Sequence, residues 1–249
     1  MDESKAFLKL KKIYSNLASD CSALRFELPV KTVYNPLVYA SRPHGMYLKL
    51  AGAAPKKIIF LGMNPGPWGM AQTGVPFGEI SAVRDWLGIE AAVSKPDIEH
   101  PKRPIEGFAC TRSEVSGRRL WGLFRDHFNT PQEFFRNNFI ANYCPLVFMD
   151  INGANITPDK LHRNEKEKLF EICDRALADI IKFFEPEWLI GIGAFAKKRI
   201  DNVSAQYFND AEKFSSLQIL HPSPASPKAN SGWEKEVLET LAKSGIALK

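Results

Sequence analysis

The sequence lacks the features that mark membrane-spanning and secreted proteins. No stretch of its 249 residues reaches the roughly 18 consecutive apolar residues of a membrane-spanning helix. The amino terminus is charged and continues into a mixed helical pattern, unlike the apolar segment of a secretory signal. We therefore expect an intracellular protein that does not associate with a membrane.

Cysteine is scarce and widely spaced. Cys21, Cys110, Cys144 and Cys173 form no CxxC motif of the kind used for metal or redox chemistry, so buried free thiols are expected. The spacing also argues against an iron–sulfur cluster, although four cysteines could still converge in space. No carboxylate cluster or metal-ligand spacing demands a cofactor. We expect no metal and no other cofactor.

The chain also lacks Ser/Gly-rich linkers and internal repeats. Its length would allow two domains at ~100–200 residues each, but α/β folds often exceed that size as one unit. With 45% hydrophobic residues it can bury a substantial core. We predict that residues 1–249 form a single domain. The net charge of +5 permits an anionic partner without requiring one.

The most informative stretch runs from Ile58 to Glu79. A β-branched apolar run ends abruptly in a loop that is crowded with Gly and Pro, which is how a buried strand delivers a rigid loop to a sheet edge. Met63, Asn64, Trp68, Met70, Gln72 and Phe77 are interspersed in this loop, and such a mixture suits a flat ligand with polar edges. A purely structural strand-to-helix connection is the alternative.

Apolar segments and turn residues predict alternating helices and strands. We expect strands near 57–61, 138–142, 188–193 and 216–220, and helices near 4–24, 81–87, 116–128, 164–184, 194–199 and 233–241. Ser116 is the expected cap of the third helix. Apolar residues in the segment 30–50 follow neither the helical spacing nor the alternation of a strand, so this segment is predicted to form a long ordered loop. This alternation favours a mainly parallel, four-stranded sheet.

Three polar residues stand where predicted strands end. Asn64, Asn142 and His221 would meet outside the carboxyl ends of parallel strands, which is where ligands of such sheets bind. Each of them alone is ordinary turn chemistry. Their joint placement predicts a shared cleft.

The segment from Cys110 to Trp121 combines arginines with hydroxyl groups. It could bind phosphates through Arg, hydroxyl and backbone N–H groups. A solvated start of a helix with ordinary surface arginines explains the same composition. The sequence leaves both interpretations open.

Three motifs together resemble a known family. The run from Gly62 to Gly78 (GMNPGPWGMAQTGVPFG), the strand exit from Asn142 to Leu146 (NYCPL) and the HPSP motif from His221 to Pro224 resemble the single-strand-selective monofunctional uracil-DNA glycosylases. The similarity covers roughly residues 34 to 233 and includes RSEVSG from Arg112 to Gly117. It implies a three-layer α/β/α sandwich around the short, mainly parallel four-stranded sheet.

The resemblance implies an enzyme that cleaves the N-glycosidic bond between uracil, or a C5-modified uracil such as 5-hydroxymethyluracil, and deoxyribose. It would act on single- and double-stranded DNA, as a monomer, and would leave an abasic site. Asn64 and His221 would be catalytic, the first positioning water and the second donating to uracil O2. Phe77 would stack on the base, and Asn142 would read its edge.

The remaining implied contacts concern the base and the DNA backbone. Met63, Gly66 and Met70 would complete the base-binding pocket, the two methionines near uracil C5, although both could simply pack beneath the loop. The implied DNA-binding residues are Arg112, Ser113, Ser116, Arg118, Arg119, Pro222, Ser223, Pro224 and Lys228. Ala225 stands where vertebrate members tend to have a basic residue, so Lys228 or the arginine-rich segment would have to compensate.

Two other functions remain open at this point. One is a non-catalytic module that binds single-stranded nucleic acid through aromatic stacking and the basic segment. The other is a glycosylase of the same superfamily whose broadened pocket accepts xanthine or hypoxanthine, since an Asn can rotate to suit another base edge.

Overall fold

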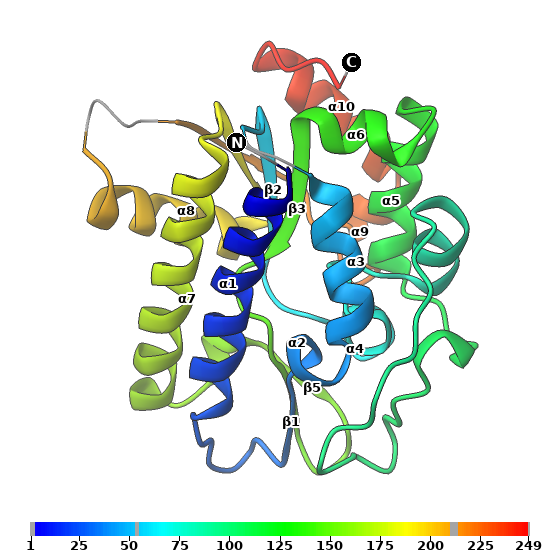
Figure 1. Cartoon of the computed structure of the whole chain (residues 1–249), viewed down its shortest axis with the longest axis vertical. Helices are drawn as coiled ribbons and strands as arrows, with labels where there is room; N and C mark the ends of the chain where they lie inside the picture. The colour runs from blue at the N-terminus through cyan, green and yellow to red at the C-terminus, as the bar shows by residue number, and fades with distance from the viewer. Residues whose placement is uncertain (1–2, 53–54, 210–213, 249) are drawn as a thin grey trace.

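A four-stranded parallel sheet forms the centre of the computed structural model, which describes residues 3–52, 55–209 and 214–248 (Figure 1). Its strands are β2 (Ile58–Gly62), β3 (Asn138–Asn142), β6 (Trp188–Ile192) and β7 (Ser215–Ile219), in the order β3-β2-β6-β7. Every residue of β2 and β3 is buried, as expected for parallel strands covered on both faces. The predicted strands and their parallel arrangement are confirmed.

Helices cover both faces of this sheet. Figure 1 shows α1 (Glu3–Ser22), α7 (Arg163–Phe184) and α8 (Ala194–Tyr207) on one side, with α5 (Val115–His127) and α10 (Trp233–Lys243) on the other. Contacts of α7 with α1 and α8, and of α10 with α5 and β7, fix the two layers. The three-layer α/β/α sandwich is thus observed.

The prediction of a long loop at residues 30–50 was wrong. This segment contains β1 (Thr32–Tyr34), α2 (Pro36–Tyr39) and α3 (Ser41–Ala51). The first two elements are only three and four residues long, too short for either period to be recognised in the sequence. Tertiary hydrogen bonds stabilise both elements instead. Tyr34 of β1 donates to the carbonyl of Arg103, and Tyr39 of α2 donates to that of Ala71, both at 2.7 Å.

A second, small sheet was also not predicted. In it β1 pairs antiparallel with β4 (Val147–Met149), and β4 pairs antiparallel with β5 (Asn155–Ile156). The order is β1-β4-β5, so the sheet joins an early segment to the chain that follows β3. It places residues 155–157 close to the end of the main sheet.

The remaining elements are short. They are α4 (Met70–Thr73), α6 (Pro131–Asn137), α9 (Pro227–Asn230) and single turns at Ala82–Trp86, Gly107–Ala109 and Pro158–Lys160. The turn at Ala82–Trp86 is π-helical and replaces the expected helix near 81–87. Ser116 is not a cap, because α5 begins at Val115 and its N-cap is Glu114.

All four cysteines are buried free thiols, as expected. Those of Cys21, Cys144 and Cys173 lie together in the core, and burial raises the pKa of Cys173. Within the described ranges no set of three His, Cys, Asp or Glu residues could hold a metal ion. Likewise, none of the described helices has the length and hydropathy needed to cross a membrane.

Close packing of β6 against α8 gives a test of the fold. A Cβ atom on Gly191 would lie 2.6 Å from the Cα atom of Lys197. Gly191→Ala should therefore lower the free energy of unfolding by about 1–3 kcal/mol through overpacking. Gly122, inside α5, has open space around its Cβ direction, so Gly122→Ala should raise stability by about 1 kcal/mol. Urea denaturation measures both, and equal effects would contradict this packing.

Candidate functional site

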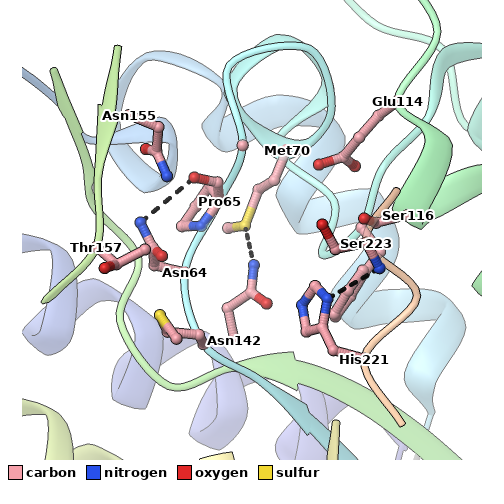
Figure 2. A pocket seen from close by; sticks show the side chains of 13 residues that line it. Asn64, Pro65, Met70, Glu114, Ser116, Asn142, Asn155, Thr157, His221 and Ser223 are labelled. Atoms are coloured by element: carbon pink, nitrogen blue, oxygen red, sulfur yellow. Dashed lines mark hydrogen bonds between the residues drawn. The ribbon is translucent and has the colours of Figure 1, made fainter. Parts of the chain in front are cut away.

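A cavity of about 390 Å³ opens at the carboxyl ends of the parallel strands. Asn64 follows β2, Asn142 ends β3, and His221 follows β7, so the three predicted strand-end residues do share one cleft (Figure 2). The volume lies within the range of ordinary ligand sites. The cavity is lined by Met63, Asn64, Pro65, Gly66, Met70, Phe77, Glu114, Ser116, Asn142, Asn155, Thr157, His221 and Ser223.

Asn142 presents an unused hydrogen-bond acceptor to this cavity. Its Nδ2 group donates to the Met70 sulfur at 3.3 Å, which orients the amide. Its Oδ1 atom is buried and has no hydrogen-bond partner. A Cβ atom on Gly62 would lie 2.5 Å from that oxygen, so only glycine fits beside it. Since a buried unpaired acceptor costs free energy, the site is arranged for a ligand that supplies a hydrogen-bond donor.

Phe77 forms an aromatic wall of the cavity and has a strained backbone. Its φ angle is +53°, in the left-handed region that non-glycine residues rarely adopt. The surrounding loop holds this conformation, because Trp121 Nε1 donates to the Pro76 carbonyl at 3.1 Å. The Phe77 carbonyl also lies so close to Gly117 that a side chain there would clash. Such over-determined strain is typical of a functional site.

The side chain of Asn64 is fixed by its amide nitrogen. Nδ2 donates to the carbonyl of Leu146 at 3.1 Å and to that of Pro65 at 3.4 Å. Backbone bonds beyond the strand ends support this placement, since Cys144 N donates to the Met63 carbonyl at 2.9 Å. With the nitrogen occupied, the Oδ1 atom is left to accept a hydrogen bond, for instance from a water molecule.

His221 is arranged as a neutral donor. Its Nδ1 atom accepts the backbone N–H of Ser223 at 3.1 Å, which places the ring proton on Nε2. Burial lowers the pKa of the imidazole below its ordinary value of 6.5, so the neutral form prevails at pH 7. The ring centroids of His221 and Phe77 are 6.4 Å apart. A flat ligand against Phe77 would therefore meet an Nε2–H donor at its rim.

Gln72 and Trp68, two loop residues that the sequence suggested as ligand contacts, do not line the cavity. Gln72 is fully buried, donates to the carbonyls of Pro67 and Pro104, both at 3.0 Å, and accepts from two backbone N–H groups. It stiffens the loop. The Trp68 ring lies under the guanidinium groups of Arg103 and Arg112, at 5.2 and 4.6 Å from its centroid.

Glu114 is a cavity residue that the sequence analysis did not single out. Its Oε2 atom is buried and has no hydrogen-bond partner. A Cβ atom on Gly66 would lie 2.6 Å from its Oε1 atom, and a Cβ atom on Gly69 would meet Oε2. Both glycines and the RSEVSG motif are visible in the sequence. Nothing in the sequence shows that the glycine-rich loop and this motif lie in contact. Pro65, Asn155 and Thr157 also line the cavity and were not predicted.

Two neighbouring carboxyl groups have opposite pKa shifts. Burial, with a smaller contribution from the negative charge of Glu79, raises the pKa of Glu114 to about 7. The pKa of Glu79 is lowered despite the opposing effect of burial, because the Ala82 N–H and the hydroxyls of Ser81 and Ser113 all donate to it. Glu79 is therefore ionised at neutral pH, and Glu114 is partly protonated.

The residues predicted to contact DNA fall into two groups. Ser116 and Ser223 line the cavity. Around it, Ser113 donates to Glu79 at 2.9 Å, Arg118 lies 3.5 Å from the Ser113 hydroxyl, and Arg119 donates to the carbonyl of Pro222 and the side chain of Asn230, both at 2.9 Å. Arg119 thereby supports the loop after His221, where Pro222 is buried and Pro224 and Lys228 are exposed.

Comparisons with known proteins agree on one family. Residues 51–242 match the family model of the uracil DNA glycosylase superfamily. The single-strand selective monofunctional uracil-DNA glycosylases of Rattus norvegicus and Mus musculus are 46% and 45% identical over 230 residues. These alignments cover 92% of this chain and 82% and 81% of the relatives.

A solved structure supports the same fold. The crystal structure of wild-type SMUG2 from Pedobacter heparinus superimposes with a TM-score of 0.65 at 15% sequence identity. The superposition covers 94% of this chain and 97% of that chain. At this level of identity the likeness concerns the fold alone.

The raised pKa of Glu114 predicts a pH-dependent cost in stability. Between its ordinary pKa of 4.5 and the folded value of about 7, the unfolded chain releases this proton while the folded chain retains it. The stability of the fold therefore decreases as pH rises through this window, by up to about 3 kcal/mol.

Glu114→Gln removes this ionisation. The variant should be more stable than the wild type, and the difference in unfolding free energy between the two proteins should be larger at pH 8 than at pH 5. Urea denaturation measures this difference. Asp126→Asn, which removes an exposed carboxylate on the same helix, is the control and should show no such difference. A gain for Glu114→Gln that is equal at both pH values would refute the assignment.

Proposed function

Because the chain belongs to the uracil DNA glycosylase superfamily, we propose that it hydrolyses the N-glycosidic bond between uracil and deoxyribose in DNA and leaves an abasic site without cutting the strand. The observation that carries this proposal is the buried, unpartnered Oδ1 atom of Asn142 at the base of the cavity. C5-modified uracils such as 5-hydroxymethyluracil are included as substrates.

Asn142 explains why uracil and not cytosine is the substrate. Its Oδ1 atom would accept from uracil N3–H, and its Nδ2 group, now on the Met70 sulfur, would donate to O4. Cytosine presents the reverse pattern, an acceptor at N3 and a donor at N4. Binding cytosine would leave buried groups unpaired on both sides, and this is the strongest form of discrimination available to a polar pocket.

The base must leave the DNA stack to reach this cavity. Extrusion of a nucleotide costs a few kcal/mol in unstacking and unpairing. Stacking of the uracil on Phe77 offsets part of this cost, since a base–aromatic contact contributes about 1–3 kcal/mol. The strained, rigid loop around Phe77 holds the ring ready before the base arrives, so little ordering remains to be done on binding.

His221 stabilises the leaving group. As the glycosidic bond stretches, negative charge develops on uracil O2 and positive charge on the sugar. The Nε2–H group of the neutral ring donates to O2 as this charge grows, without net proton transfer. The Ser223 N–H bond to Nδ1 holds the ring in that tautomer throughout.

Asn64 positions the attacking water. An amide is too weak a base to deprotonate water at neutral pH, so its Oδ1 atom orients the nucleophile and does not activate it. This suits a dissociative path, in which an oxocarbenium-like sugar forms first and water then adds to it. Most of the rate enhancement then comes from the leaving-group side.

The DNA backbone would lie across the rim of the cavity. Ser116 and Ser223, which line the cavity, would meet phosphates next to the extruded nucleotide. Arg112, Arg118 and Lys228 are exposed and would supply positive charge. We propose that single- and double-stranded DNA are both substrates, that the protein acts as a monomer, and that it works inside the cell.

An excision assay tests the proposal against its alternatives. Incubation with a uracil-containing oligonucleotide followed by alkali should yield strand breaks, while omission of alkali should leave the strand intact. Parallel substrates with xanthine, hypoxanthine or thymine test a broadened pocket. No break at uracil after alkali would refute uracil excision, and no break on any of these substrates would leave a binding module.

His221→Ala provides the mechanistic arm of the same assay. Loss of a preorganised donor costs about 100-fold or more in the chemical step. We expect the single-turnover rate of the variant to fall by that amount. Its affinity for uracil-containing DNA should stay within about threefold of the wild type, a change smaller than the loss of a typical hydrogen bond would cause. A near-normal rate would remove the O2 donor role from His221.

A further inference from the structure

We propose that Glu114 reads the C5 substituent of the extruded base, accepting a hydrogen bond from a 5-hydroxymethyl group and rejecting a 5-carboxylate. This inference rests on the proposed function of the cavity and assigns a specificity role to a residue outside the predicted catalytic and base-binding set.

The position follows from the way in which Asn142 orients the base. Uracil O4 would take the place beside Asn142 Nδ2, which lies 3.3 Å from the Met70 sulfur. C5 is the next ring position after C4 and lies across the ring from O2, hence away from His221. A substituent on C5 therefore points past Met70 toward the wall of the cavity that contains Gly66 and Glu114.

Figure 2 shows the Glu114 carboxyl group pointing toward the Met70 side chain at that wall. Side chains are absent at Gly66 and Gly69, and the carboxyl occupies the space that their Cβ atoms would fill. The backbone loop thus leaves an opening in which a charged or polar group reaches the cavity.

The missing partner argues against a purely structural role. Most buried polar atoms that stabilise a fold are hydrogen-bonded, but the Glu114 Oε2 atom is buried without a partner. Glu79 nearby shows the contrast, because Ser81, Ser113 and the Ala82 N–H all donate to it. Protein donors hold Glu79, whereas Glu114 has none on Oε2, and its other oxygen, Oε1, lies beside the cavity-lining Gly66.

The chemistry of the group sets which substituents it favours. A hydroxymethyl group can donate to a carboxyl oxygen whether Glu114 is ionised or neutral. A 5-carboxylate brings a second negative charge beside a carboxyl that already faces the ionised Glu79, which contributes to the raised pKa of Glu114. Like charges at such short range oppose binding. Uracil itself has no C5 substituent and makes no contact there.

The test compares three substrates with variants of one residue. Excision of uracil, 5-hydroxymethyluracil and 5-carboxyuracil is measured under single-turnover conditions in the same sequence context. Glu114→Ala should lower kcat/KM for 5-hydroxymethyluracil about tenfold and leave that for uracil within about twofold, which is below the effect of one hydrogen bond. Glu114→Gln keeps an acceptor oxygen, so it should retain 5-hydroxymethyluracil excision and increase 5-carboxyuracil excision over the wild type.

Asp126→Asn, on the same helix but outside the cavity, is the matched control and should alter none of the three rates. An unchanged ratio of 5-hydroxymethyluracil to uracil in Glu114→Ala would overturn the inference. An equal loss on both substrates would also overturn it, by showing that Glu114 only supports the fold. If the wild type excises no uracil, the failure belongs to the proposed function and not to Glu114.

Discussion

The site depends on one pairing, that of Gly62 with Asn142 at the carboxyl ends of two adjacent parallel strands. This register brings the Asn142 amide beside a residue without a side chain, where any Cβ atom would collide with Oδ1 and with the Phe77 ring. Beyond the strand ends the two chains remain hydrogen-bonded, because Tyr143 N donates to the Gly62 carbonyl next to the loop that contains Asn64. The proposed base reading, stacking and water positioning therefore all depend on this one strand contact.

The second consequence of this arrangement is a cavity whose polar groups are prepared before a ligand arrives. The loop from residue 62 to residue 79 is fixed by Gln72 and Trp121, both buried and hydrogen-bonded to backbone carbonyls. Strain at Phe77 and unpaired acceptors on Asn142 and Glu114 are costs in stability. A ligand that donates hydrogen bonds to these acceptors would recover part of this cost on binding.

Much of the main sheet could be predicted, because β2, β3 and β6 are mostly apolar and Gly or Pro stands at the end of each strand or within three residues after it. Parallel strands also collect their ends at one edge. The small sheet that contains Asn155 could not, since its three strands have only two or three residues each. Glu114 was missed for another reason. Its place in the cavity depends on a contact between loop glycines and the start of a helix about 45 residues further on, which no local pattern encodes.

In the proposed function the Asn142 amide reads the uracil edge, and Asn142→Asp removes one half of the hydrogen-bonding pattern that it offers. The aspartate keeps the acceptor for N3–H but cannot donate to O4 when ionised. Single-turnover excision of uracil should fall by at least about tenfold, with the folded state verified by urea denaturation. Undiminished uracil excision by this variant would contradict the reading role of Asn142, because the base would then have to be recognised by other residues.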